Sequence, residues 1–214
     1  MNKNETGRVE AFSDGVFGVA ITLLVLNIHI PRLSDLAPGQ RLINALLVQW
    51  PVYLAYATSF LSVLVIWISH HNLFTFIKKV DQRFLLINGL LLMGVTLVPF
   101  PTALVAEHVR FANERAATQV YGVMSFVIWL VYNGLWWYAS HKHRLLEPDT
   151  PQAVIRSITW QFGLAPALYL VGFALSYVSA WFSLAIFLFI PILFAARTLG
   201  RRNELTQMPA ADNA

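Results

Sequence analysis

The sequence predicts an all-α integral membrane protein with six transmembrane helices. Hydrophobic residues make up 57% of the chain and charged residues only 12%, whereas a soluble domain carries about 25% charged residues. The apolar residues fall into six segments, and each is long enough to cross a bilayer at about 1.5 Å per residue. Helices are expected because a spanning segment must satisfy its own backbone hydrogen bonds, and the alternation typical of a membrane barrel is missing.

The predicted spans are joined by short polar links. They cover residues 9–30, 44–68, 84–106, 118–140, 157–177 and 180–197. Together they form one transmembrane domain, 1–200, and the polar tail 201–214 is expected to be disordered. Spans five and six are joined around Ser179 as a tight hairpin, and Pro191 lies within the last span.

The basic residues indicate how the chain crosses the membrane. Eleven of the fifteen Lys and Arg fall on the same side as the N-terminus. The positive-inside rule therefore predicts cytoplasmic N- and C-termini in a multi-pass protein of the cell membrane. This loop bias accounts for the net charge of +4, so no nucleic-acid partner is expected. Since the chain has no Cys, disulfides and thiolate metal sites are excluded.

The first span has two distinct faces when it is placed on a helix. One is an apolar stripe at steps of four and three residues, formed by Phe12, Val16, Val19, Leu23, Leu26 and Ile30. The neighbouring face carries small side chains that permit close helix approach: Ala11, Gly15, Gly18 and Thr22. Such a helix suits assembly with copies of itself around an axis. The alternative is that the stripe packs against the other five helices of the same chain.

Polar residues gather at the start of the first span and at the end of the second. Ser13 and Asp14 precede the apolar run, and an acid there is costly unless it is paired or caps the helix. His70 and His71 are predicted to lie at the same side of the membrane. Adjacent histidines point about 100° apart on a helix, so no metal site is expected. A structural cluster of hydrogen bonds is the preferred interpretation, with Arg8, Ser13, Asp14, His70 and Asn72 as candidate members.

Two motifs carry a resemblance to a known family. The run Arg8-x-x-x-Phe12-Ser13-Asp14 resembles the signature of the transmembrane protein 175 family, and Trp67 with His70 and His71 resembles its second-helix pattern. These proteins are potassium channels of prokaryotic membranes and of animal endosomes and lysosomes. The six-helix length resembles the prokaryotic form, which has one copy of the unit.

The resemblance implies a homotetramer in the lipid bilayer that conducts potassium ions, without cofactor, fixed metal or enzymatic activity. The first helices would line the pore, with a constriction at Val19, Leu23 and Leu26 and selectivity assisted by the Thr22 hydroxyl. This hydrophobic gate would replace a carbonyl filter, and no Thr-Val-Gly-Tyr-Gly loop is present. The family network of structural polar residues would fall on Arg8, Ser13, Asp14, His70 and His71.

The resemblance also bears on how the channel conducts. Relatives most often have Ile or Leu where this chain has the shorter Val19, so only modest selectivity over sodium is expected. The chain has no Arg-rich helix for voltage sensing, which favours a leak-like conductance.

The sequence leaves two other functions to consider. A proton-coupled secondary transporter of a small solute is the main alternative, supported by the prolines within the spans. It is disfavoured because the middles of the spans lack ionisable residues. An intramembrane enzyme would need a metal or nucleophile site. Its only candidate residues lie in one charged loop that is expected to be solvated: His141, His143, Glu147 and Asp149. His29, near the outer mouth, is expected to be an interfacial histidine in water.

Overall fold

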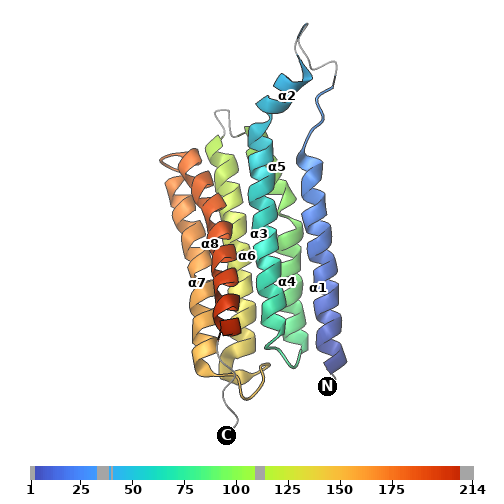
Figure 1. Ribbon diagram of the computed structural model, residues 1–214, viewed down its shortest axis with the longest axis vertical. Helices are drawn as coiled ribbons and strands as arrows, with labels where there is room; N and C mark the ends of the chain where they lie inside the picture. Colours follow the sequence, from blue (N-terminus) through green and yellow to red (C-terminus); the bar gives the residue numbers. More distant parts are fainter. Residues whose placement is uncertain (1–2, 33–38, 40, 109–113, 208–214) are drawn as a thin grey trace.

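The protein is a bundle of long, roughly parallel helices (Figure 1). The computed structural model describes residues 3–32, 39, 41–108 and 114–207. The elements are α1 (Lys3–Leu23), the 3-10 helix η1 (Leu24–Asn27), α2 (Leu42–Val48), α3 (Trp50–Phe74), α4 (Gln82–Thr96), α5 (Pro99–His108), α6 (Glu114–Ser140), the 3-10 helix η3 (His141–His143), α7 (Gln152–Leu175) and α8 (Ala180–Gln207).

Six helical segments are long and apolar enough to cross a membrane, which confirms the predicted all-helical class. They are Glu5–Asn27, Trp50–Phe74, Gln82–His108, Glu114–His143, Gln152–Leu175 and Ala180–Arg197. The α8 helix continues past the predicted end of the last span to Gln207, into the predicted tail, and residues 208–214 lie outside the described residues. Pro191 lies inside α8 and Pro166 inside α7, and neither ends its helix.

The second span begins later than predicted, at Trp50 and not at residue 44. The apolar residues before it form the separate short helix α2, which ends at Val48. Pro51 lies in the first turn of α3, where its missing N–H costs no helical hydrogen bond. The α3 helix also ends later than predicted, at Phe74. Trp67, His70 and His71 therefore lie within the helix and not beyond its end.

The third span is broken into α4 and α5. The backbone turns at Leu97 and Val98, and Pro99 begins α5 because proline cannot donate a hydrogen bond to the preceding turn. The α4 helix itself begins with a side-chain cap, in which Oδ1 of Asp81 accepts a 2.8 Å hydrogen bond from the backbone N–H of Phe84. The other carboxylate oxygen of Asp81 accepts a 2.6 Å hydrogen bond from the Tyr138 hydroxyl of α6.

The α1 helix begins at the lower end of the bundle in Figure 1, and α8 runs back toward that end. The α3–α4 and α6–α7 connections pair with each other there. Ile77 and Leu146 form an isolated antiparallel bridge, and Lys78 makes a 3.3 Å ion pair with Glu147. Because of this pairing, two loops that are distant in sequence hold α3, α4, α6 and α7 together at one end.

The packing of α6, α7 and α8 centres on Phe187, which is fully buried. Its ring lies against the backbones of Gly122 on α6 and Gly172 on α7. A Cβ added at Gly122 would lie 2.7 Å from Cζ of Phe187, and one at Gly172 would lie closer still to Cε1. The Ser183 hydroxyl of α8 donates a 2.7 Å hydrogen bond to the carbonyl of Gly172. The two glycines therefore provide the room that lets α8 pack on both of its neighbours.

Candidate functional site

The α1 helix packs on its own subunit through one face only. Phe17 and Ala20 of α1 and Leu24 at the start of η1 recur at three- and four-residue steps and are fully buried. The α1 helix packs against α3 and α4, and η1 packs against α3 and α5. The opposite face of α1 points outward. Among the six spans, that of α1 has the smallest share of buried residues.

The predicted constriction residues lie on the outward face. The exposed fraction is 55% for Val19, 40% for Leu23 and 71% for Leu26. Phe12 and Ile30 extend the same exposed stripe, whereas Val16 is half-buried and packs against the core. For these exposed residues, packing against the other helices of the same subunit therefore does not explain the apolar stripe.

The small residues predicted beside the stripe are exposed as well, including Gly15, Gly18 and Thr22. The Thr22 hydroxyl donates a 2.9 Å hydrogen bond to the carbonyl of Val19 on its own helix. This bond uses the proton of the hydroxyl and leaves its oxygen lone pairs available as acceptors. Thr22 therefore presents partial negative charge among apolar side chains.

A buried chain of hydrogen bonds ties α1 to α4 and α3. The Asn88 amide nitrogen on α4 donates to the Ser13 hydroxyl at 3.0 Å, and Ser13 donates to the carbonyl of Val9 at 2.8 Å. The Asn88 oxygen is 2.9 Å from Nε2 of His70 on α3. Because that oxygen can only accept, His70 carries its proton on Nε2. Its Nδ1 is then an acceptor, and this buried atom has no hydrogen-bond partner in the described part of the chain.

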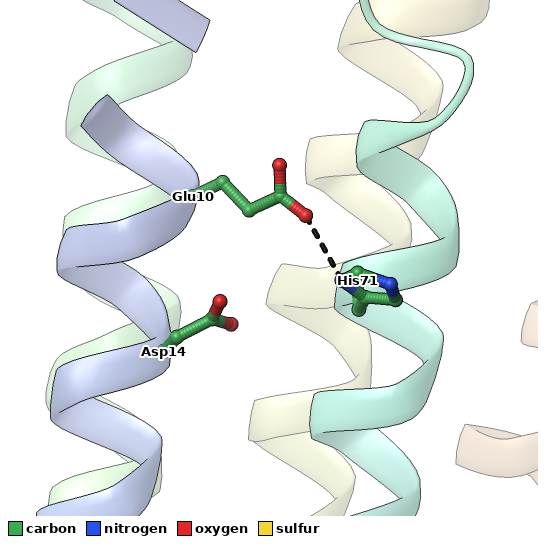
Figure 2. A group of neighbouring side chains, drawn as sticks. All are labelled: Glu10, Asp14 and His71. Carbon is green, nitrogen blue, oxygen red and sulfur yellow. Dashed lines mark ion pairs between the residues drawn. The ribbon is translucent and has the colours of Figure 1, made fainter. Parts of the chain in front are cut away.

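A second pair of contacts joins α1 to α3 beside this chain. The indole N–H of Trp67 donates a 2.8 Å hydrogen bond to Oδ1 of Asp14. One turn earlier on α1, Glu10 lies 2.9 Å from Nδ1 of His71 (Figure 2). His70 and His71 thus serve different partners, one in the core and one at the surface.

The structure corrects two parts of the predicted polar cluster. Arg8 is exposed and makes no hydrogen bond or ion pair with any residue the structure describes, so it does not pair with Asp14. Asn72 is also exposed, and its backbone carbonyl accepts a hydrogen bond from the Thr75 hydroxyl. Its side chain makes no hydrogen bond to any of the residues that the structure describes. Ser13 and His70 share the partner Asn88, whereas Asp14 pairs with Trp67 and His71 with Glu10.

Sequence reasoning missed Asn88 and Glu10. Asn88 interrupts the apolar run Leu85–Leu92, and a lone amide within a membrane span is a signal of a hydrogen-bonding role. Glu10 precedes Asp14 by four residues, a spacing that places both carboxylates on one face of a helix.

The loop proposed for an enzyme site does not form one. His143 contacts the backbone carbonyl of Thr150 through Nε2 at 3.2 Å, and His141 is exposed beside the Trp137 ring. In the part of the chain that the structure describes, these histidines do not converge with Glu147 and Asp149. His29, at the other end of α1, is exposed and lies 3.1 Å from the carbonyl of Asn27.

Comparison with known proteins identifies the family. A sequence model of the endosomal/lysosomal potassium channel TMEM175 matches residues 8–99. A potassium channel of Chamaesiphon minutus is 46% identical over 92% of this chain and 96% of its own length, and one of Streptomyces collinus is 40% identical over 85% and 87%. The endosomal/lysosomal proton channel TMEM175 of Gallus gallus is 32% identical over 93% of this chain, which spans 42% of that protein.

The fold agrees with these relationships. The crystal structure of the lysosomal potassium-selective channel TMEM175 homolog from Chamaesiphon minutus superposes with a TM-score of 0.81 at 44% identity, covering 91% of this chain and 98% of that one. The fold and site therefore define a multi-pass membrane protein of the channel class, and not an enzyme. The chain belongs to the TMEM175 family.

Proposed function

We propose that the chain is the subunit of a leak-like potassium channel in which the first helices of four copies line the ion path. The observation that carries this proposal is the outward position of the apolar stripe on α1. Val19, Leu23 and Leu26 are exposed on the subunit, while the opposite face of α1 is anchored to α3 and α4. A helix built in this way contributes one face to its own subunit and leaves the other for a shared axis. The potassium channels named among its relatives support the choice of ion.

The proposed mechanism follows from the chemistry of the stripe. Rings of Val19, Leu23 and Leu26 side chains around an axis would exclude water when the helices are close, so the closed pore is dewetted. A small outward movement of α1 would admit water and partly dehydrated cations. Potassium holds its hydration shell less tightly than sodium, so the same rings oppose sodium more strongly. The oxygen of Thr22 lies beside the stripe and would replace part of the lost hydration.

The selectivity is proposed to be modest. Val19 has a shorter side chain than leucine, so its ring would be wider and would remove less of a cation's hydration shell. We also propose that both termini lie in the cytoplasm and that the channel resides in the cell membrane. The positive-inside bias supports this orientation.

Single cysteines on the natural background test which face lines the pore, since the chain contains no Cys. Leu23→Cys and Leu26→Cys would be reconstituted in liposomes, and potassium flux would be measured before and after a membrane-impermeant cationic thiol reagent. We expect modification to reduce flux at both positions. Val171→Cys is the matched control, because Val171 is exposed on α7 and is proposed to face lipid. Modification of Leu23→Cys and Leu26→Cys without a change in flux would contradict the proposed pore.

The same liposome assay distinguishes the proposed channel from the main alternative, a proton-coupled transporter. A channel passes potassium down its own gradient with no opposing proton gradient, and a coupled transporter does not. The vertebrate relatives are named as proton channels, so a pH-sensitive dye inside the vesicles would measure proton flux alongside potassium. Potassium flux that strictly requires a proton gradient would support the transporter.

A further inference from the structure

Three potential metal ligands from two helices converge near the start of α1. Glu10 and Asp14 point from α1 toward His71 on α3 (Figure 2). One ligand atom from each of the three lies within 4.8 Å of the other two. We propose that Glu10, Asp14 and His71 bind a first-row divalent metal ion that bridges α1 and α3.

The geometry needs only side-chain adjustment to accept the ion. Zinc and similar ions bind imidazole nitrogen and carboxylate oxygen at about 2.0–2.2 Å, which places neighbouring ligand atoms about 3–3.5 Å apart. Glu10 and Nδ1 of His71 are already 2.9 Å apart. Adjustment of the Glu10 side chain, and of the Asp14 carboxylate about its bond to Trp67, would close the remaining distance.

The charge around the cluster also favours a cation. Glu10 and Asp14 lie four residues apart on one helix, where two like charges repel each other. No Lys or Arg in the described part of the chain forms an ion pair with either carboxylate. A divalent ion would neutralise both carboxylates.

Trp67 contacts two of the three proposed ligands, Asp14 and His71. Its indole N–H donates to Oδ1 of Asp14 at 2.8 Å, which fixes the orientation of that carboxylate. Its ring also stacks on the His71 ring, with centroids 6.1 Å apart and planes 25° from parallel. Such outer partners orient ligands in metal sites and strengthen binding. Trp67 thus holds Asp14 and His71 in place for a shared ligand.

The ligand set indicates the kind of metal. Imidazole suits zinc, cobalt and nickel, and carboxylates are compatible with them, whereas magnesium and calcium prefer oxygen ligands alone. The exposed fractions of His71 and Glu10, 53% and 28%, leave room for water to complete the coordination. The divergence of adjacent histidines on a helix predicted no metal site. The structure uses only His71, and the other ligands come from α1.

Direct binding tests the proposal. Tag-free purified protein would be dialysed against Co²⁺ at pH 7.5, and bound metal counted by mass spectrometry and visible absorption. We expect one Co²⁺ per chain, at least tenfold weaker binding in Glu10→Gln and His71→Ala, and unchanged binding in His141→Ala. His141 is an exposed histidine outside the cluster, so it controls for adventitious surface binding. Equal binding by all four proteins, or none by the natural chain, overturns the proposal.

Folding and metal preference are checked in the same samples. Asp14 is left unchanged because its bond to Trp67 also anchors α1. Size-exclusion profiles and thermal midpoints of the metal-free variants should match those of the natural chain. A hundredfold excess of Mg²⁺ should leave Co²⁺ bound, and displacement by that excess would overturn the assignment to a first-row metal.

A consequence for conduction rests on the proposed function. An ion that bridges α1 and α3 would oppose movement of the pore helix, so Co²⁺ should reduce potassium flux in the natural chain and not in His71→Ala. Site-dependent binding without a change in flux would keep the metal site and overturn the restraint of α1. Because binding is measured without flux, failure of the site and failure of the channel proposal remain distinguishable.

Discussion

Trp67 and Asp14 form a hydrogen bond that crosses from α3 to α1, with the indole nitrogen 2.8 Å from Oδ1 of the carboxylate. It lies beside the buried Ser13–Asn88–His70 chain, and the two connections fix the middle of α1 against α3 and α4. The acid that makes this span unusual in sequence therefore has an anchoring partner within the subunit. Farther along α1, Val19 and Leu23 of the apolar stripe are exposed on the subunit.

Trp67→Phe should loosen α1 while keeping most of the ring packing. The change removes the N–H that Asp14 accepts, and a hydrogen bond to a charged group contributes about 1.5–3 kcal/mol. We expect a loss of about 2 kcal/mol, measured as a lower thermal midpoint in detergent. Trp160→Phe is the control, since Trp160 is 78% exposed, and it should change the midpoint little. Equal effects of the two changes would show that the bond to Asp14 does not anchor the helix.

Asn88→Leu should break the buried connection between α1, α4 and α3. Asn88 bonds both Ser13 and His70, so the change leaves the buried N–H of His70 without an acceptor. Each unsatisfied buried group costs about 1–3 kcal/mol, and we expect a lower yield of folded protein and a lower thermal midpoint. Asn72→Leu, at an exposed position of α3, serves as the control. A midpoint for Asn88→Leu equal to that of the control would contradict the role assigned to the chain.

Gly172→Ala should destabilise the packing of α7 on α8. The added Cβ would overlap Phe187, which is fully buried, so the ring would have to shift within the core. Overpacking of this kind costs about 1–3 kcal/mol. Gly163→Ala on the same helix meets nothing within 4 Å and should be neutral or slightly stabilising. Phe187→Leu combined with Gly172→Ala should recover part of the loss, and independent effects of the two changes would contradict the proposed contact.

Asp81 should give the fold a dependence on acidic pH. Burial tends to raise the pKa of this carboxyl, but hydrogen bonds from Tyr138 and the backbone N–H of Phe84, with the Arg144 charge, lower the net pKa below its ordinary value. A carboxyl with a lowered folded pKa stabilises the fold above its unfolded pKa of about 4, and this contribution is lost as pH falls through the folded value.

Tyr138→Phe tests this dependence. Removing the hydroxyl should raise the pKa of Asp81 toward its ordinary value and flatten the fall in thermal midpoint between about pH 5 and pH 3. Tyr53→Phe is the comparison variant on a different helix. An unchanged pH profile in Tyr138→Phe would contradict the coupling.

Leu26→Ala should change conduction rather than folding. Leu26 is 71% exposed on the subunit, so truncation removes little intramolecular packing and should leave the thermal midpoint nearly unchanged. A wider and less apolar ring should raise potassium flux and lower the preference for potassium over sodium. Flux and preference equal to those of the natural chain would place the constriction elsewhere.

The sequence predicted the spans well because each is a long, uniformly apolar run. Its errors lie where a proline divides such a run. The segment from residue 44 is predicted as one helix by hydropathy, yet α3 begins at Trp50, with Pro51 in its first turn, and α2 is separate. Hydropathy likewise does not register the turn before Pro99, because both sides of the break are apolar.

Some residues of the candidate site were predicted from the sequence, but their pairings were not. Ser13, Asp14 and His70 were identified because polar groups are costly in a membrane span. Their partners depend on the rotation of α3 and α4 about their own axes, which a single sequence does not specify. The two carboxylates of α1 illustrate this: their spacing is visible in sequence, and their approach to His71 is visible only in the fold.

The direction of the first and last helices has a consequence for gene duplication and fusion. An even number of crossings returns the chain to the end of the bundle where it began. A duplicated copy fused after α8 would therefore have the same orientation in the membrane as the first copy. No additional transmembrane helix would be needed between the two copies. The Gallus gallus relative, of which this chain spans 42%, is long enough for such a tandem. Fusion of two units by a short hydrophilic linker should accordingly preserve the orientation of both.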